Sequence, residues 1–130
     1  MIDTGVYSYI NVLGAAADAS SVRNELIANN IANNDTPEYK RQDIDFTSVL
    51  KTALESGSDD MTLGQKVRLA SQKDLSGQIY TDHEELSYRT DGNNVDISVE
   101  NVELASNQIQ YQYLLSSINK EFQMLQSVMK

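Results

Sequence analysis

The sequence predicts a mainly α-helical protein whose long N- and C-terminal helices pair as an antiparallel coiled-coil hairpin, joined by a middle arm. Apolar residues recur at alternating steps of four and three near both ends of the chain. An asparagine cluster and the single proline, Pro37, punctuate the first of these segments. We expect residues 1–35 and 95–130 to form a helical core, and residues 36–94 to hold a turn, a short helix and a flexible, possibly β-hairpin-containing arm.

The first helix should begin near Asp3 or Thr4, since either residue can cap it. It should end by Asp35, because Pro37 lacks a backbone donor and disfavours helical geometry at Thr36. The asparagines before the proline tolerate the left-handed backbone that often ends a helix. The sequence therefore predicts an abrupt helix stop joined to a sharp turn.

Each terminal segment carries one heptad-like apolar stripe, which we interpret as a surface for assembly. The first stripe is broken by Ser20 and Asn24, and the second by Gln108. The N-terminal seam comprises Val6, Ile10, Leu13, Ala17, Ile27 and Ile31. The C-terminal seam comprises Leu104, Tyr111, Leu115, Ile118, Phe122, Leu125 and Met129.

Both segments also carry apolar residues beside the seam, such as Val12 in the first and Ile109 in the second. A two-helix hairpin buries one seam per helix, so this surplus needs another cover. Residues 56–78 are largely polar and contain three glycines, which predicts a loosely ordered arm. We therefore favour neighbouring copies of the chain as the cover, with the middle segment as the alternative.

The middle of the chain contains three local signals. Apolar residues at helical spacing over 46–54 predict a short helix that closes near Gly57. The run Asp91–Asn94 predicts a tight turn, after which Asp96 or Ser98 would cap the last helix. Between these signals a short local hairpin is indicated by the β-capable residues Ile79, Tyr80, Leu86 and Tyr88.

Composition excludes several classes of function. The net charge of −9 opposes binding to nucleic acid or to an anionic membrane surface. The absence of cysteine excludes disulfides and thiolate zinc sites. The N-terminal segment carries an acid where a secretory signal would carry basic residues, so export would use another route.

The motifs of catalysis and metal binding are incomplete. His83 lacks the second histidine of a zinc-protease helix, because Ser87 stands four residues later. The stretch from Asp91 resembles the start of a calcium loop, but Asp96 and Val102 stand where glycine and glutamate are required. Carboxylate pairs such as Asp43 with Asp45 could act on a glycan, yet such pairs are expected among 19 acids. We expect no catalytic residue, metal, cofactor or small-molecule substrate.

The residues NIANNDTPEYKR, from Asn30 to Arg41, resemble the signature NIANxNTPGYKR of bacterial flagellar rod and hook proteins. The run DGNNVDISVENVELASNQIQYQYLL, from Asp91, is similar to the proximal rod subunits of that family. Glu38 replaces the usual glycine, which favours a type I over a type II turn. The resemblance covers residues 5–54 and 88–130, and its signature loop comprises Asn30, Asn33, Thr36, Pro37, Tyr39, Lys40 and Arg41.

The resemblance implies a structural subunit of the proximal rod in the flagellar basal body. Such subunits leave through the flagellar type III export apparatus without a cleaved signal peptide, and polymerise helically through their terminal helices into a hollow periplasmic rod. The implied partners are further copies of the chain, FlgC-like rod proteins, a FliE-like adaptor and the MS ring, with no nucleic acid. The signature loop could then lock one subunit against the next, or be a purely local turn.

Two alternatives stay open from the sequence. One is a soluble coiled-coil adaptor or chaperone that binds a single partner helix. The other is the sister proximal rod protein FlgC, which is similar in size. An adaptor would need only one exposed helical face, whereas a rod subunit needs both terminal helices.

Overall fold

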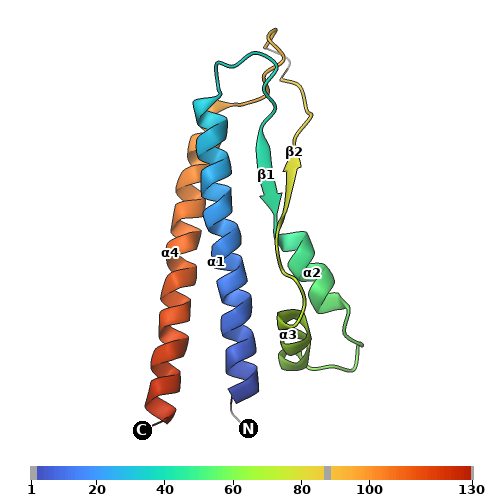
Figure 1. The fold of residues 1–130 in the computed structure, drawn as a ribbon, viewed down its shortest axis with the longest axis vertical. Helices are drawn as coiled ribbons and strands as arrows, with labels where there is room; N and C mark the ends of the chain where they lie inside the picture. Colours follow the sequence, from blue (N-terminus) through green and yellow to red (C-terminus); the bar gives the residue numbers. More distant parts are fainter. Residues whose placement is uncertain (1–2, 87–88, 130) are drawn as a thin grey trace.

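The computed structural model describes residues 3–86 and 89–129 as two long helices with an arm lying along one of them (Figure 1). Helix α1 spans Asp3–Ala32 and helix α4 spans Ile97–Val128. The two helices lie side by side and antiparallel, so the start of α1 and the end of α4 share one end of the molecule (Figure 1). The predicted antiparallel helical hairpin is confirmed.

The helix ends follow the local chemistry of the sequence. Asp96 caps α4, its Oδ1 accepting the backbone N–H groups of Ser98 at 3.0 Å and Val99 at 3.3 Å. Helix α1 begins at Asp3 and ends before the proline, as predicted. Ser20 and Asn24, the polar breaks of the N-terminal stripe, lie at the contact between the two helices, whereas Gln108 of the C-terminal stripe is exposed.

The centre of the α1–α4 contact is polar. Asn107 Nδ2 donates to the carbonyl oxygen of Ser20 and to Oδ1 of Asn24, each at 2.8 Å. Ser20 Oγ donates back to Asn107 Oδ1 at 3.0 Å. Apolar side chains, among them Ile27 and Leu114, are buried on the same two helices. A single buried amide in a coiled-coil seam fixes the register of the pair at some cost in stability.

The arm contains a two-stranded antiparallel ribbon and two short helices. Strand β1, Gln42–Asp45, pairs with strand β2, Gln78–Thr81, so that Gln42 lies opposite Thr81. The strand at Ile79 and Tyr80 therefore pairs with a distant segment, and the expected local pairing with Leu86 is wrong. Tyr88, the other member of the predicted hairpin, lies outside the described residues.

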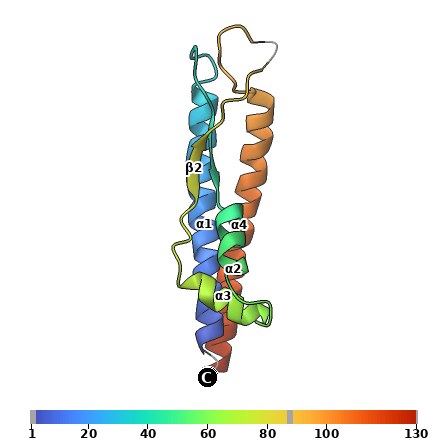
Figure 2. The same cartoon turned by 90° about the vertical axis from the view of Figure 1, so that its right-hand side faces the viewer.

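Helices α2, Thr47–Glu55, and α3, Leu63–Ser71, complete the arm (Figure 2). The short helix predicted over residues 46–54 is confirmed as α2. The loosely ordered segment predicted after it is wrong, because α3 forms there. Thr62 Oγ1 accepts the Gln65 N–H, and Gln65 Oε1 accepts the Thr62 N–H, so a capping box starts this helix. The signal was present in the sequence but was outweighed by the neighbouring glycines.

The arm covers the second apolar face of α1. Ala53, Ala70 and Leu75 form a small buried cluster, against which Val12 and Ala15 of α1 pack together with further side chains of the arm. The expectation that neighbouring copies cover the surplus of both helices is therefore wrong for α1. The middle segment supplies enough apolar surface because α3 is ordered and aims Ala70 inward.

The turn that follows α1 is held in an unusual backbone conformation. Glu38 has φ +64°, and the Tyr39 N–H donates to the Thr36 carbonyl at 3.3 Å, as expected of a type II turn with proline at its second position. The predicted type I turn is wrong. The Glu38 N–H donates to the Asp91 carbonyl at 2.9 Å, so a contact with a distant loop holds the strained residue in place.

Replacing Glu38 by glycine should stabilise the protein, because glycine adopts positive φ without a steric penalty. The left-handed region costs an L-residue roughly 1–2 kcal/mol, and glycine avoids this cost but loses more backbone entropy on folding. The free energy of unfolding should therefore rise by about 0.5–1 kcal/mol. Urea unfolding measures it. Glu38→Ala is the matched control, because it removes the same carboxylate but keeps the Cβ atom. Equal stability of the two variants would contradict the strain.

Candidate functional site

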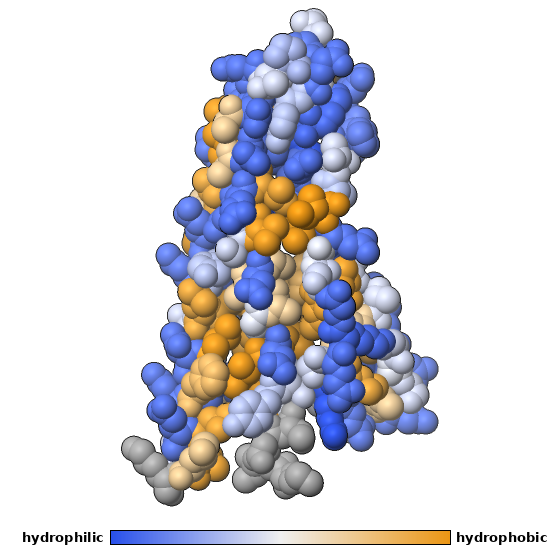
Figure 3. All heavy atoms as spheres, viewed as in Figure 1, coloured by the Kyte–Doolittle hydropathy of each residue, from blue (hydrophilic) through white to orange (hydrophobic). Residues whose placement is uncertain are grey.

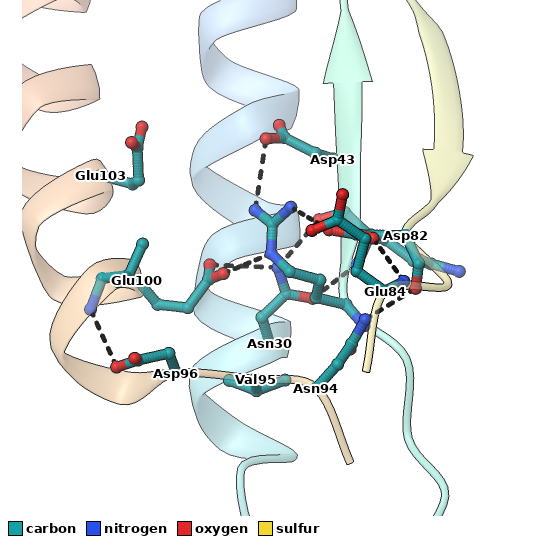
Figure 4. A network of polar contacts seen from close by, with 12 residues as sticks. Asn30, Asp43, Asp82, Glu84, Asn94, Val95, Asp96, Glu100 and Glu103 are labelled. Atoms are coloured by element: carbon teal, nitrogen blue, oxygen red, sulfur yellow. Dashed lines mark hydrogen bonds and ion pairs between the residues drawn. The ribbon is translucent and has the colours of Figure 1, made fainter. Parts of the chain in front are cut away.

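A buried polar cluster ties the end of α1 to the start of α4 (Figure 4). We call it the clamp, and its members are Arg23, Asn30, Arg41, Asp43 and Glu100. Glu100 is 1% exposed, and its Oε1 accepts from Arg41 Nε at 2.6 Å while its Oε2 accepts from Asn30 Nδ2 at 3.2 Å. A carboxylate this deeply buried is tolerated only when charged and polar partners surround it.

Asn30 joins α1 to the outer edge of strand β1. Its Nδ2 donates to the Gln42 carbonyl at 2.8 Å, and its Oδ1 accepts the Gln42 N–H at 2.9 Å. The side-chain amide thus takes the place of a neighbouring strand at this residue. Tyr39 Oη donates to the same Oδ1 at 3.1 Å. Burial, and next the charge of Glu100, raise the pKa of Tyr39, so its hydroxyl stays protonated as a donor.

Two arginines share Asp43 between them. Arg23 Nε donates to Asp43 Oδ1 at 2.9 Å, and Arg41 Nη2 donates to Asp43 Oδ2 at 3.3 Å. Burial alone would lower the pKa of Arg41, but the hydrogen bond and charge of Glu100 raise it overall. Burial likewise opposes ionisation of Asp43, yet the hydrogen bond from Arg23 holds its pKa below the ordinary value. Arg41 and Asp43 therefore both stay charged at neutral pH.

The turn at Asp91–Asn94 satisfies the carbonyl groups left open where α1 ends. Asn93 Nδ2 lies within 2.8–3.1 Å of the carbonyl oxygens of Asn33, Asn34 and Thr36. Asn94 Oδ1 accepts the Arg41 N–H at 2.7 Å. The segment that resembled a calcium loop thus serves to hydrogen-bond the carbonyl groups at the end of α1. No group of three or more potential metal ligands occurs within residues 3–86 and 89–129.

The structure brings the signature-loop residues together and uses them inside the chain. Asn30, Tyr39 and Arg41 belong to or contact the clamp, and Lys40 Nζ donates to the Gly92 carbonyl at 2.6 Å. Asn33 and Thr36 supply carbonyls to Asn93, and Pro37 opens the type II turn. The loop therefore holds the start of α4 against the end of α1, which neither sequence interpretation of it anticipated.

Sequence reasoning missed Glu100, Arg23 and Asn93 as site residues. A signal for Glu100 existed: it lies four residues before Leu104, which places a carboxylate on the line of the C-terminal seam. A charge on an apolar stripe indicates a buried partner. Arg23, one residue before the polar break at Asn24, carried no comparable signal.

The seam residues are covered to different degrees. In the N-terminal seam Ala17 and Ile27 are buried, and Val6, Ile10, Leu13 and Ile31 are partly exposed. In the C-terminal seam Leu104, Tyr111, Ile118 and Leu125 are partly exposed, and Leu115, Phe122 and Met129 are exposed. The face of α4 that is buried carries Glu100, Asn107 and Leu114. The seam side chains of α4 are thus less buried than the heptad-like stripe predicted.

Polarity divides the molecule along its length. The face in Figure 3 is hydrophilic at the end that holds the loops and carries apolar residues over the helices below it. The opposite end of the helix pair holds the start of α1 and the end of α4, and we call it the open end. A pocket of about 400 Å³ between the helices at this end is lined by Val6, Tyr7, Glu121, Met124, Leu125, Val128 and Met129. The arrangement offers apolar helical surface for protein contacts, anchored at one end by the clamp.

Two long helices are held together by the clamp at one end, expose apolar side chains, and are followed by the loop of the NIANNDTPEYKR sequence. This combination defines a structural subunit of the flagellar axial type. No protein-family model matches the chain. It is 33% identical over 121 residues to the flagellar basal body rod protein FlgB of Escherichia coli K12, covering 88% of each chain. The corresponding values are 36% over 123 residues and 92% of each chain for Bacillus subtilis FlgB, and 32% over 127 residues and 98% for Cereibacter sphaeroides FlgB.

The chain belongs to the FlgB family of flagellar basal body rod proteins. The family is a structural one and not a family of enzymes. Its place is the rod of the basal body. Across the described parts of the chain, the helices lack the combination of length and apolar character that a membrane span requires.

Acid should weaken the clamp through Asp43. Because its pKa is lower in the folded protein than its ordinary 3.8, the stabilisation is complete above that value and is lost as the pH falls through the folded pKa. Urea unfolding between about pH 7 and pH 2 should show this loss, and Asp43→Asn should lower stability at pH 7 and flatten the acid decline. Asp59→Asn, which removes an exposed carboxylate between α2 and α3, is the control. An unchanged decline in Asp43→Asn would refute the assignment.

Proposed function

We propose that this chain is a proximal rod subunit that polymerises helically through α1 and α4 into a hollow tube, which serves as a drive shaft. One observation carries the proposal. Among the described residues, ten of the fifteen exposed large apolar side chains lie between Ile97 and Met129. All of them except Met129 belong to α4, which α1 covers on one side only, so most of the uncovered apolar surface is on α4.

The free energy gained by burying apolar side chains supports assembly as what stabilises the helices at the open end. A large apolar side chain contributes roughly 1.5–3 kcal/mol when it is fully buried, but these side chains face water in a single copy. Contacts between different surfaces of successive copies produce a filament when the rotation between copies does not close a ring. Assembly then supplies burial that a lone chain lacks, while the clamp holds the two helices in register for it.

The proposed partners are those of a subunit at the base of the rod. They are other copies of the chain, FlgC-like rod proteins, a FliE-like adaptor and the MS ring, with delivery by the flagellar type III export apparatus. The signature loop and the FlgB relatives support this placement. The net charge of −9 argues against a role in nucleic-acid binding.

A soluble coiled-coil adaptor or chaperone is the second candidate. The apolar pocket between Val6 and Met129 favours it, because a partner's side chains could fill that pocket without polymerisation. An adaptor would fold as a stable monomer and bind one helix. A rod subunit would instead become more helical as it assembles into larger species.

The concentration dependence of helicity separates the two. Circular dichroism and sedimentation velocity of the full chain should show incomplete helix in dilute monomer and more helix as larger species form, because the open end is buried only by neighbours. A fully helical, cooperatively unfolding monomer that never associates would count against the rod subunit and favour the adaptor.

Deletion of either terminal helix gives a second discrimination. Removing residues 1–25 or residues 106–130 should each abolish assembly with the full chain, since both helices supply surface to the tube. Co-sedimentation with the full chain provides the measurement. An adaptor would retain partner binding after one of the two deletions.

A further inference from the structure

The charges of the chain are unevenly distributed. Residues 35–103 contain fifteen of the nineteen acidic residues and seven of the ten basic ones, so they hold −8 of the net −9. In contrast, Leu104–Asn119 of α4 contains no charged residue, and neither does Gly5–Ala17 of α1. The long uncharged surfaces of this acidic protein therefore lie on its terminal helices.

One side of α4 combines this neutrality with exposed apolar residues. Val102, Ile109 and Tyr113 are 68%, 69% and 70% exposed. At 3.6 residues per turn they lie on the side of α4 opposite its buried residues Glu100, Asn107 and Leu114. Ser106 and Ser116 join them at spacings of four and three, up to but not including the charged Lys120. We call these five residues the outer face of α4.

The outer face is distinct from the C-terminal seam, and its three large side chains stay mostly exposed among residues 3–86 and 89–129. The arm lies along α1, where it covers Val12 and Ala15 (Figures 1 and 2). The outer face combines three large side chains with the two small ones of Ser106 and Ser116, which suits knobs-into-holes packing against another helix. Depletion of charge with retention of aromatic residues is typical of the centre of a protein interface.

We propose that the outer face of α4 is where a second copy of this chain packs, an inference that rests on the proposed rod assembly and names its contact surface. Two copies of charge −9 repel each other, and the repulsion is least where neither copy presents charge. A basic partner would instead gain most on the acidic segment between residues 35 and 103. Charge therefore selects a second copy as the occupant of this uncharged face.

The test is a charge placed on the outer face of the full-length chain. Ile109→Glu should leave the monomer's circular dichroism unchanged, because the side chain is exposed, and should weaken self-association roughly tenfold or more, because the contact would bury an unpaired carboxylate. Sedimentation velocity across a concentration series gives the association constant. Val102→Glu repeats the test should Ile109→Glu fold poorly.

Asn119→Glu is the matched control, since it adds the same charge to another exposed side of α4 and should change association little. Leu115→Glu places the charge in the C-terminal seam. Loss of association in Leu115→Glu but not in Ile109→Glu would overturn the inference and leave the rod assembly standing. Absence of self-association by the parent chain at every concentration would overturn both.

Salt provides an independent readout. Added salt screens the repulsion between acidic copies, and an uncharged contact contains no ion pair that salt could weaken. Self-association of the parent chain should therefore strengthen as ionic strength rises. Weakening by salt would overturn the inference, because it would require charged groups at the contact.

Discussion

The buried ion pair between Arg41 and Glu100 is the contact on which the arrangement of the helices depends. It joins the loop after α1 to the first turn of α4, and Asn30 and Asp43 complete its hydrogen bonds. Loss of either partner of a buried pair typically costs about 3–5 kcal/mol, because the remaining charge stays without compensation. The loop that resembles the flagellar signature is thereby part of the internal structure of the subunit, with its tyrosine, lysine and arginine all engaged within the chain.

This constraint divides the molecule into two unequal ends. Near the loops, charged and amide side chains are buried and paired, and Ile27 and Val95 are almost fully covered. Toward the termini, the helices expose Phe122, Val128 and Met129 and carry few charges. The clamped end fixes the direction and register of two long helices, and the other end presents them to neighbours. A rod subunit needs both properties, since a polymer requires reproducible geometry and available surface.

Local chemistry made the long helices, α2 and the cap at Asp96 predictable. Helical spacing, Pro37 and a single carboxylate before the last helix were sufficient, because each acts over a few residues. The partner of strand β2, the ordered helix α3 and the positive φ of Glu38 were missed. Each depends on contacts between segments far apart in the sequence, such as the bond from Glu38 to Asp91. The family signature located the site, but its role within the chain required Glu100 and Asn93, whose partners lie 57–70 residues away.

Residue-resolved hydrogen exchange of the free chain and of the assembled chain tests the central claim most directly. The account predicts that backbone amides near the clamp, in Leu26–Asn30 and Glu100–Asn107, are protected in the free chain. Amides in Val6–Ile10 and Phe122–Val128 should exchange readily in the free chain and become protected on assembly. Equal and strong protection along both helices of the free chain would contradict it, because the open end would then be stable without neighbours.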